Sequence, residues 1–165
     1  MTSNVPIIRP IAWLSILPQL VVMGVIIYGY RLIGYGDTFI LGILTYVALA
    51  IILRNLIAKS HRRGVRLTRQ QKFSEAIPFF EKSVDYFSKN SLIDKYRFLT
   101  LLSSSKMRYR EMGLCNIAFC YSQTGKGSKA KRYYEEVLKA FPENSLAIAG
   151  LNMLNSVDTK AQVSE

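Results

Sequence analysis

Residues 10–30 read PIAWLSILPQLVVMGVIIYGY, an apolar stretch that carries no charge. A helix needs about 20 apolar residues to cross the hydrocarbon core of a bilayer, and this stretch supplies them between Arg9 and Arg31. The second apolar stretch, TFILGILTYVALAIIL at 38–53, is shorter, but Arg54 can extend its charge toward the headgroups so that the span continues. The sequence therefore predicts two membrane spans, about 10–30 and 38–57, after an N-terminal tail at 1–9.

A cleaved signal peptide is the alternative interpretation of the first stretch. No basic run follows Met1, Pro18 interrupts the apolar segment, and residues 29–32 offer no pair of small residues for cleavage. We therefore favour a retained span. The connection at 31–37 is too short for a domain, so residues 10–58 are expected to form an antiparallel transmembrane hairpin.

The distribution of charge predicts the orientation of this hairpin, because Lys and Arg close to the end of a span are retained in the cytoplasm. Residues 54–72 contain seven cations and no acid, whereas the connection between the spans has Arg31 against Asp37. We expect a multi-pass protein of the cell's inner (plasma) membrane, with both termini and the domain that follows the spans in the cytoplasm. Cys115 and Cys120 are then free thiols in a reducing compartment.

The formal net charge of +11 is compatible with two classes of anionic partner, lipid and nucleic acid. Most of the charge lies beside the membrane, where a cation near anionic headgroups contributes about 1 kcal/mol. No zinc-ligand spacing or RNA-binding signature accompanies the charge. We therefore predict anionic lipid, and no nucleic acid, as the partner of a basic collar made of Arg54, Lys59, Arg62, Arg63 and Arg66.

The remaining residues have a helical pattern throughout, because apolar residues recur at spacings of three, four and seven. Two segments also resemble each other: residues 72–83, KFSEAIPFFEKS, align with residues 126–137, KGSKAKRYYEEV. The sequence therefore predicts an all-α chain, with short antiparallel helices arranged as a repeat.

These copies resemble the tetratricopeptide (TPR) repeat family, at about 57–90 and 111–144. The first copy has Gly64, Leu67, Ala76 and Phe80 at the family's packing positions, and the second has Leu114, Ile117, Ala118, Tyr121, Ala130, Tyr134 and Pro142. The first copy departs from the family at Ser60, Ser83 and Ser88. The resemblance implies helix-turn-helix pairs in which a small Ala lets a neighbouring helix approach and an aromatic side chain fills the space beside it.

The copies are offset by 54 residues, Ala76 to Ala130, whereas the family's period is 34 residues. We therefore expect an insert at 91–110, forming an extended helix that runs into the second repeat. A capping helix is predicted at 145–157 with Asn144 at its N-cap, and a disordered tail at 158–165. No Gly or Pro separates Leu53 from the helix that starts the first repeat. One helix is therefore expected from Thr38 to about Gln70, running from the second span into a TPR-like domain at 59–157.

Members of this family usually bind a partner segment in the groove made by their first helices. The resemblance places that groove at Met112, Asn116, Phe119 and Gln123 of the second repeat and at His61 and Arg69 of the first. The alternative interpretation is that these are ordinary surface and inter-helix residues. Two repeats are fewer than the three that usually make a stable stack, so self-association into a homo-oligomer is a further expectation.

The sequence contains no convincing catalytic, cofactor or metal site. Gly125-Lys126-Gly127-Ser128 imitates a phosphate loop, but a Walker loop needs Lys followed directly by Ser or Thr after a strand. Cys115 and Cys120 are five residues apart, which suits packing and not metal binding. We therefore expect that the protein is not an enzyme. The leading expectation is a membrane-anchored TPR-like adaptor or scaffold that binds a protein partner. The alternative is an accessory subunit of a transport, secretion or enzyme complex in which the hairpin is the working part.

Overall fold

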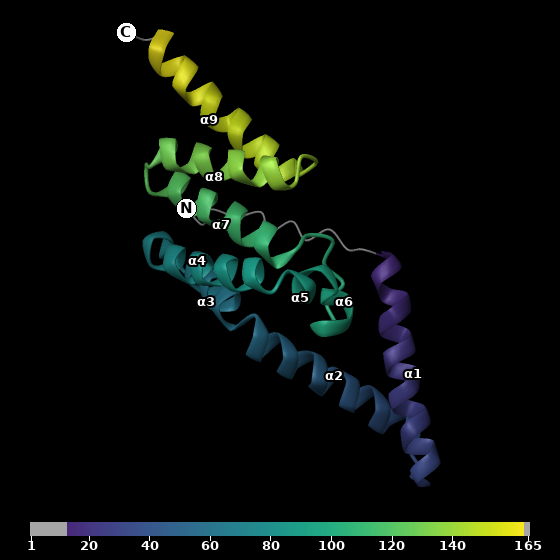
Figure 1. The fold of residues 1–165 in the computed structure, drawn as a ribbon. Coiled ribbons are helices and arrows are strands. Elements are labelled where there is room, and N and C mark those ends of the chain that lie inside the picture. Colours follow the sequence, from purple (N-terminus) through teal and green to yellow (C-terminus); the bar gives the residue numbers. More distant parts are fainter. Residues whose placement is uncertain (1–12, 164–165) are drawn as a thin grey trace. The chain divides into compact units, whose positions relative to one another are not determined.

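The computed structural model describes residues 13–163, and every regular element in that part of the chain is a helix (Figure 1). The all-α prediction is therefore confirmed for these residues. The chain forms two compact units: residues 1–59 with 90–108, and residues 60–89 with 109–165. The elements are η1 (Trp13–Ser15), α1 (Ile16–Ile33), α2 (Thr38–Ile57), α3 (Lys59–Arg69), α4 (Phe73–Lys89), α5 (Ser91–Lys95), α6 (Arg97–Thr100), α7 (Tyr109–Gln123), α8 (Gly127–Ala140) and α9 (Ser145–Val163).

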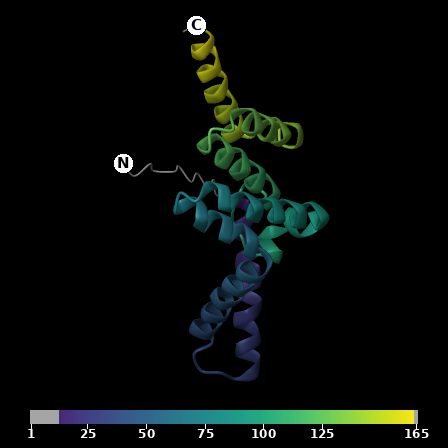
Figure 2. The same cartoon turned by 90° about the vertical axis from the view of Figure 1, so that its left-hand side faces the viewer.

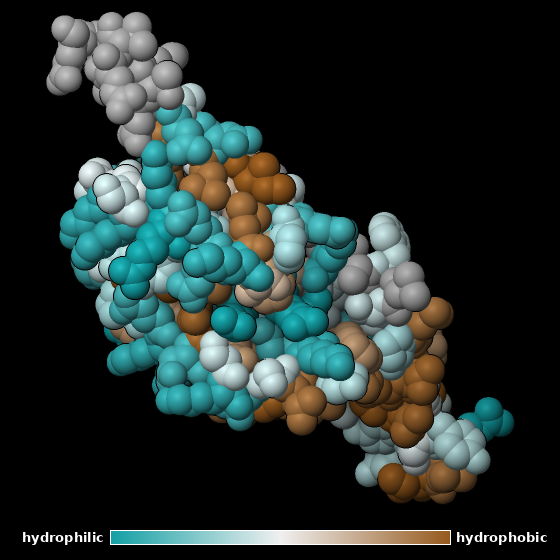
Figure 3. Space-filling model, turned by 45° about the horizontal axis from the view of Figure 1, so that its top comes forward, coloured by the Kyte–Doolittle hydropathy of each residue, from teal (hydrophilic) through white to brown (hydrophobic). Residues whose placement is uncertain are grey.

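The first unit contains α1 and α2, which pack against each other and are long and apolar enough to cross a membrane. The second span was predicted at 38–57, and α2 has these bounds. Helix α1 begins at Ile16 and ends at Ile33; the predicted tail at 1–9 and the predicted start of the first span at residue 10 lie outside the described residues. Figure 3 shows apolar surface gathered over this helix pair, which agrees with the exposed Leu17, Val21, Leu44 and Ile52.

The two apolar helices approach each other closely. A Cβ atom on Gly42 would lie only 2.3 Å from Ile27 Cγ1, so this position has room for glycine alone. Two polar pairs join the helices: Tyr30 Oη and Thr45 Oγ1 are 2.8 Å apart, and the Tyr46 hydroxyl donates to Gln19 Oε1 over 3.4 Å. Polar side chains that bond across apolar helices are a normal means of holding such helices together.

Residues 90–108 do not form the predicted extended helix, and this prediction is wrong. The chain makes α5 and α6, leaves the helix at Leu101, and continues as an irregular segment to Arg108. Leu102 has a left-handed backbone with φ of 47°, which a helix cannot contain. The segment groups with the apolar helices, and α6 packs against α1.

The predicted single helix from Thr38 to Gln70 is also wrong, because the chain leaves the helix at Ala58. Ala58 has φ of −97° and ψ of 25°, although its N–H still bonds the carbonyl of Arg54. The apolar helix and the basic helix are therefore two elements, α2 and α3.

The second unit is an array in which α4 packs against α7, α7 against α8, and α8 against α9. Figure 2 shows these helices following one another in chain order, from teal through green to yellow. Its core joins α4 to α7 through buried apolar side chains: Ala76, Ile77, Phe80, Ile117 and Cys120. Because α4 and α7 are neighbours, residues 60–89 and 109–165 form one continuous array without the intervening segment.

Helix α9 is longer than the predicted cap at 145–157. Its start is as predicted, because Asn144 Oδ1 accepts the N–H of Ala147 over 2.8 Å. The helix then continues to Val163, so residues 158–163 are helical and not disordered as predicted, and the rest of the predicted tail, 164–165, lies outside the described residues. Neither Gly nor Pro occurs between residues 151 and 163 to end it.

Candidate functional site

The second unit is built around close contacts between small and aromatic residues. Ala76 and Ala130 are fully buried, and in each case an aromatic residue four positions later, Phe80 or Tyr134, is buried beside it. A Cβ atom on Gly64 would lie 2.8 Å from Phe80 Cε1, so the ring of Phe80 packs directly on the α3 backbone. These contacts fix α3 against α4 and so decide which faces of the helices remain open.

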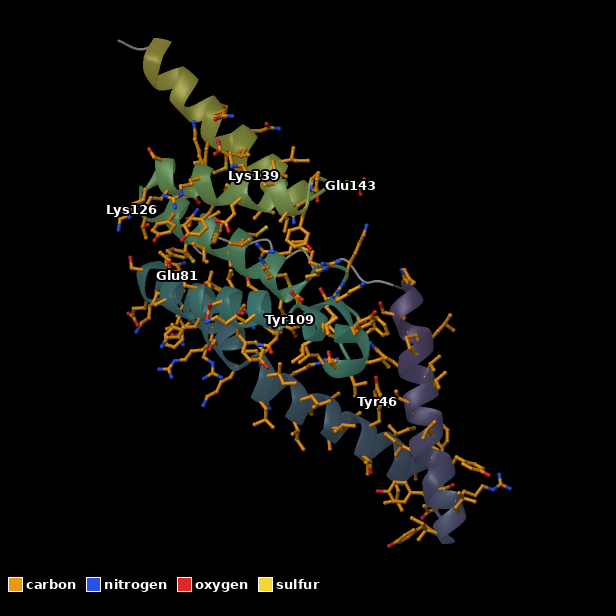
Figure 4. All side chains as sticks on the ribbon, in the orientation of Figure 1. Tyr46, Glu81, Tyr109, Lys126, Lys139 and Glu143 are labelled. Carbon is orange, nitrogen blue, oxygen red and sulfur yellow. The ribbon has the colours of Figure 1, made fainter. Side chains whose placement is uncertain are left out.

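His61 does not lie on an open face, contrary to the groove prediction. Its ring is buried, in edge contact with the rings of Phe80 at 5.6 Å and Tyr109 at 5.2 Å. Its Nδ1 lies 3.5 Å from Ser83 Oγ. Figure 4 shows Tyr109 at the start of α7, where this aromatic cluster joins α3, α4 and α7. His61 therefore packs inside the array and does not form part of an open face.

The four groove residues predicted on α7 do share one face of that helix. Met112, Asn116, Phe119 and Gln123 follow one another at spacings of four, three and four, which places them in one stripe along an α-helix. We call these four residues the α7 stripe. The first three are partly exposed and Gln123 is exposed. The ring of Phe119 rests edge-on against Phe73 of α4 at 5.8 Å, which holds an aromatic surface at the middle of the stripe.

A buried polar cluster beside the α7 stripe joins α7 to the start of α9. Asn144 Nδ2 donates to Glu111 Oε1 over 2.7 Å, and Cys115 Sγ lies 3.7 Å from Asn144 Oδ1. Burial, together with the nearby Glu111 carboxylate, raises the pKa of the Cys115 thiol to about 12. Burial likewise raises the pKa of Cys120 to about 11. Both thiols are therefore protonated packing groups and not nucleophiles.

Helix α3 has a buried face and a charged face. His61, Gly64 and Thr68 are buried on one side. The opposite side is an exposed row of cations, which we call the α3 cationic face: Lys59, Arg62, Arg63, Arg66 and Arg69. No carboxylate of the described residues forms an ion pair with these five side chains, and the Arg63 guanidinium lies 4.7 Å from the centre of the Phe79 ring. Arg69 therefore belongs to this cationic face, although it was predicted as part of the groove.

Arg54 does not belong with these exposed cations, although it was predicted to contact lipid headgroups. Its Nε donates to the carbonyl of Leu101 over 3.1 Å, and its Nη2 donates to the carbonyl of Leu102. The guanidinium thus holds the backbone at the end of α6. The sequence contains no signal for this partner, because Leu101 and Leu102 contribute backbone carbonyls and not side chains.

Among the side chains that the structure describes, no group of three or more His, Cys, Asp or Glu residues could hold a metal ion. A scan against protein-family models, a search of curated proteins and a search of solved structures each found no match to this chain. Two surfaces stand out among the described residues: the α7 stripe presents an aromatic ring between amides, and the α3 cationic face presents positive charge without a carboxylate partner.

Proposed function

We propose that this chain is a membrane-anchored adaptor of the TPR type, which binds a segment of a partner protein on the α7 stripe at the cytoplasmic face of the membrane. The observation that carries the proposal is the burial of corresponding positions in the two copies. Each pair is separated by 54 residues, and both members are buried: Gly64 and Ala118, Ala76 and Ala130, Phe80 and Tyr134, Ser83 and Val137.

The placement of residues 90–108 supports the same interpretation. These 19 residues group with the apolar helices and not with the array. Without them the offset between the copies falls from 54 to 35 residues, close to the family's period of 34. Helix α4 then meets α7 as the second helix of one repeat meets the first helix of the next, and α9 covers the open side of α8.

The anchor in this proposal is the pair α1 and α2. Both are apolar over 18 or more residues, and their large apolar side chains are mostly exposed, as expected for helices that face lipid. The α3 cationic face follows the second span after one residue, Ala58, so its exposed cations suit the anionic headgroups of the cytoplasmic leaflet. Anchor and charge together hold the repeat array at the membrane surface.

The α7 stripe is the partner surface that we propose within the array. Aromatic side chains contribute strongly to protein interfaces, and Phe119 is kept partly exposed by its edge contact with Phe73. Asn116 and Gln123 beside it offer amide donors and acceptors that bond the backbone of an extended segment. The stripe therefore provides both an apolar anchor and polar contacts for a bound peptide or helix.

A crosslinking experiment tests this function. A photoreactive amino acid at Gln123 is expected to capture a discrete partner protein in cells, because this exposed position ends the stripe. The matched control is the same amino acid at Lys139, an exposed position on α8 outside the stripe (Figure 4). Equal capture from both positions would contradict the groove. Capture only from Leu49, on the exposed side of α2, would favour the alternative in which the hairpin is the working part.

A further inference from the structure

The segment Asn90–Arg108 is a braced structure and not a loose loop. Arg97 donates from Nε and Nη2 to the carbonyl of Ser105 over 3.0 and 2.8 Å, and from Nη1 to the carbonyl of Asp94 over 3.2 Å. Thr100 Oγ1 donates to the carbonyl of Ile93 over 2.8 Å. These bonds from side chains to backbone carbonyls fold the segment onto itself and give it a defined surface.

The segment is attached to the open end of the apolar helix pair. The contacts of Tyr46 with Gln19 and of Gly42 with Ile27 show that α1 and α2 run antiparallel, so Arg54 lies at the end of the pair where α1 begins. Arg54 binds the carbonyls of Leu101 and Leu102, and α6 packs on α1 (Figure 1). If the helices span a bilayer, this attachment places the segment where they leave the hydrocarbon core.

The exposed surface of the segment is apolar with cations beside it. Leu92 is 68% exposed, and Tyr96 and Leu99 are each 44% exposed, at spacings of four and three residues. The Lys95 ammonium lies 5.5 Å from the centre of the Tyr96 ring. The single acid of the segment, Asp94, is 2% exposed and so contributes no surface charge. Leu, Tyr and Lys side chains grouped in this way are typical of elements that lie in a membrane interface.

We propose that residues 90–108 are an interfacial membrane element. Leu92, Tyr96 and Leu99 enter the boundary between headgroups and acyl chains of the bilayer that α1 and α2 cross, and Arg54 fixes the depth of the element. The occupant of the apolar surface is lipid, because the segment is tied to the ends of the spans and its exposed charge is positive. This inference rests on the membrane anchor of the proposed function.

Tryptophan fluorescence in proteoliposomes tests the proposal, since Trp13 is the single tryptophan of the chain. Two variants are made in a Trp13→Phe background, each with one reporter tryptophan in the segment: Leu99→Trp and Leu92→Trp. Their fluorescence reports how close the segment lies to the lipid. The vesicles contain lipids brominated either near the headgroup end or near the terminus of the acyl chain. An element ~5–10 Å below the headgroups is expected to be quenched about twofold more by the first lipid than by the second. Lys139→Trp, at an exposed position on α8, is the control that neither lipid quenches.

A reporter in the span separates failure of this inference from failure of the anchor. Val47→Trp, on the exposed side of α2, is expected to be quenched most by bromines near the chain terminus. If Val47→Trp is quenched and both segment reporters are not, the interfacial element is overturned while the anchor stands. If no reporter is quenched, the anchor and the inference fail together. Blue-shifted segment emission that neither lipid quenches would mean that protein covers this surface, which also overturns the proposal.

Discussion

Arg54 decides the position of a whole segment through two hydrogen bonds. It holds the carbonyls of Leu101 and Leu102, and Leu102 keeps a left-handed backbone that is unfavourable for a bulky residue. Hydrogen bonds to a charged group contribute roughly 1.5–3 kcal/mol, so Arg54→Met is expected to speed amide hydrogen exchange over residues 97–105 by about tenfold or more. Exchange in α4 and α7 should not change. Hydrogen–deuterium exchange with mass spectrometry of the protein in nanodiscs measures both.

The control for this change is Arg31→Met, which removes the exposed arginine at the other end of the helix pair. Arg31→Met is expected to leave the rate of amide hydrogen exchange over residues 97–105 the same as in the unsubstituted protein. If both variants have the same effect, loss of positive charge and not the two carbonyl bonds is the cause.

Gly64 is a second residue that decides local packing, because the absence of a side chain lets the Phe80 ring approach the α3 backbone. A Cβ atom there would lie 2.8 Å from Phe80 Cε1, and the Phe80 side chain is fully buried. Gly64→Ala is therefore expected to lower the free energy of unfolding by about 1–3 kcal/mol, the usual cost of overpacking. Gly127→Ala is the control, because its Cβ would meet no atom within 4 Å. Urea unfolding in detergent micelles compares the two; an equal effect would exclude close packing as the reason for glycine at position 64.

At the scale of elements, the sequence predicts helices well where apolar periodicity or length alone defines them. The bounds of α2 and the start of α9 at Asn144 are examples. Prediction fails where a side chain binds a distant backbone carbonyl, as Arg97 and Arg54 do, because neither sequence spacing nor hydropathy reveals such a bond. The site shows the same division: the α7 stripe follows from helical spacing, whereas burial of His61 depends on Tyr109, which is 48 residues away.

Helix α3 carries five exposed cations that form no ion pair with a carboxylate of the described residues. Each cation near an anionic membrane contributes about 1 kcal/mol, so Arg62→Gln with Arg66→Gln is expected to reduce the preference for anionic over zwitterionic lipid by about fivefold per charge. Native mass spectrometry of the protein in mixed micelles measures this preference. The control pair, Lys126→Gln with Lys139→Gln, removes two exposed cations from the region of α8 (Figure 4). If the preference for anionic lipid falls equally in both double variants, the net charge of the protein and not the α3 cationic face is its cause.

At the scale of the whole molecule, a hairpin anchor requires its turn and its repeat array to lie on opposite sides of the membrane. Two substitutions report this: Gly36→Cys in the turn, where an added side chain meets no atom within 4 Å, and Ser88→Cys at an exposed position on α4. The native Cys115 and Cys120 are buried, with pKa values raised to about 12 and about 11, so they contribute little background.

Because cations concentrate after α2 and not in the turn, an impermeant maleimide is expected to label Gly36→Cys in intact cells and Ser88→Cys only in inverted membrane vesicles. Labelling of Ser88→Cys from outside would reverse the orientation but keep the hairpin. Labelling of both positions from one side would overturn the crossing itself. The proposed adaptor would then have no membrane anchor, and α1 and α2 would need a protein surface to cover their exposed apolar side chains.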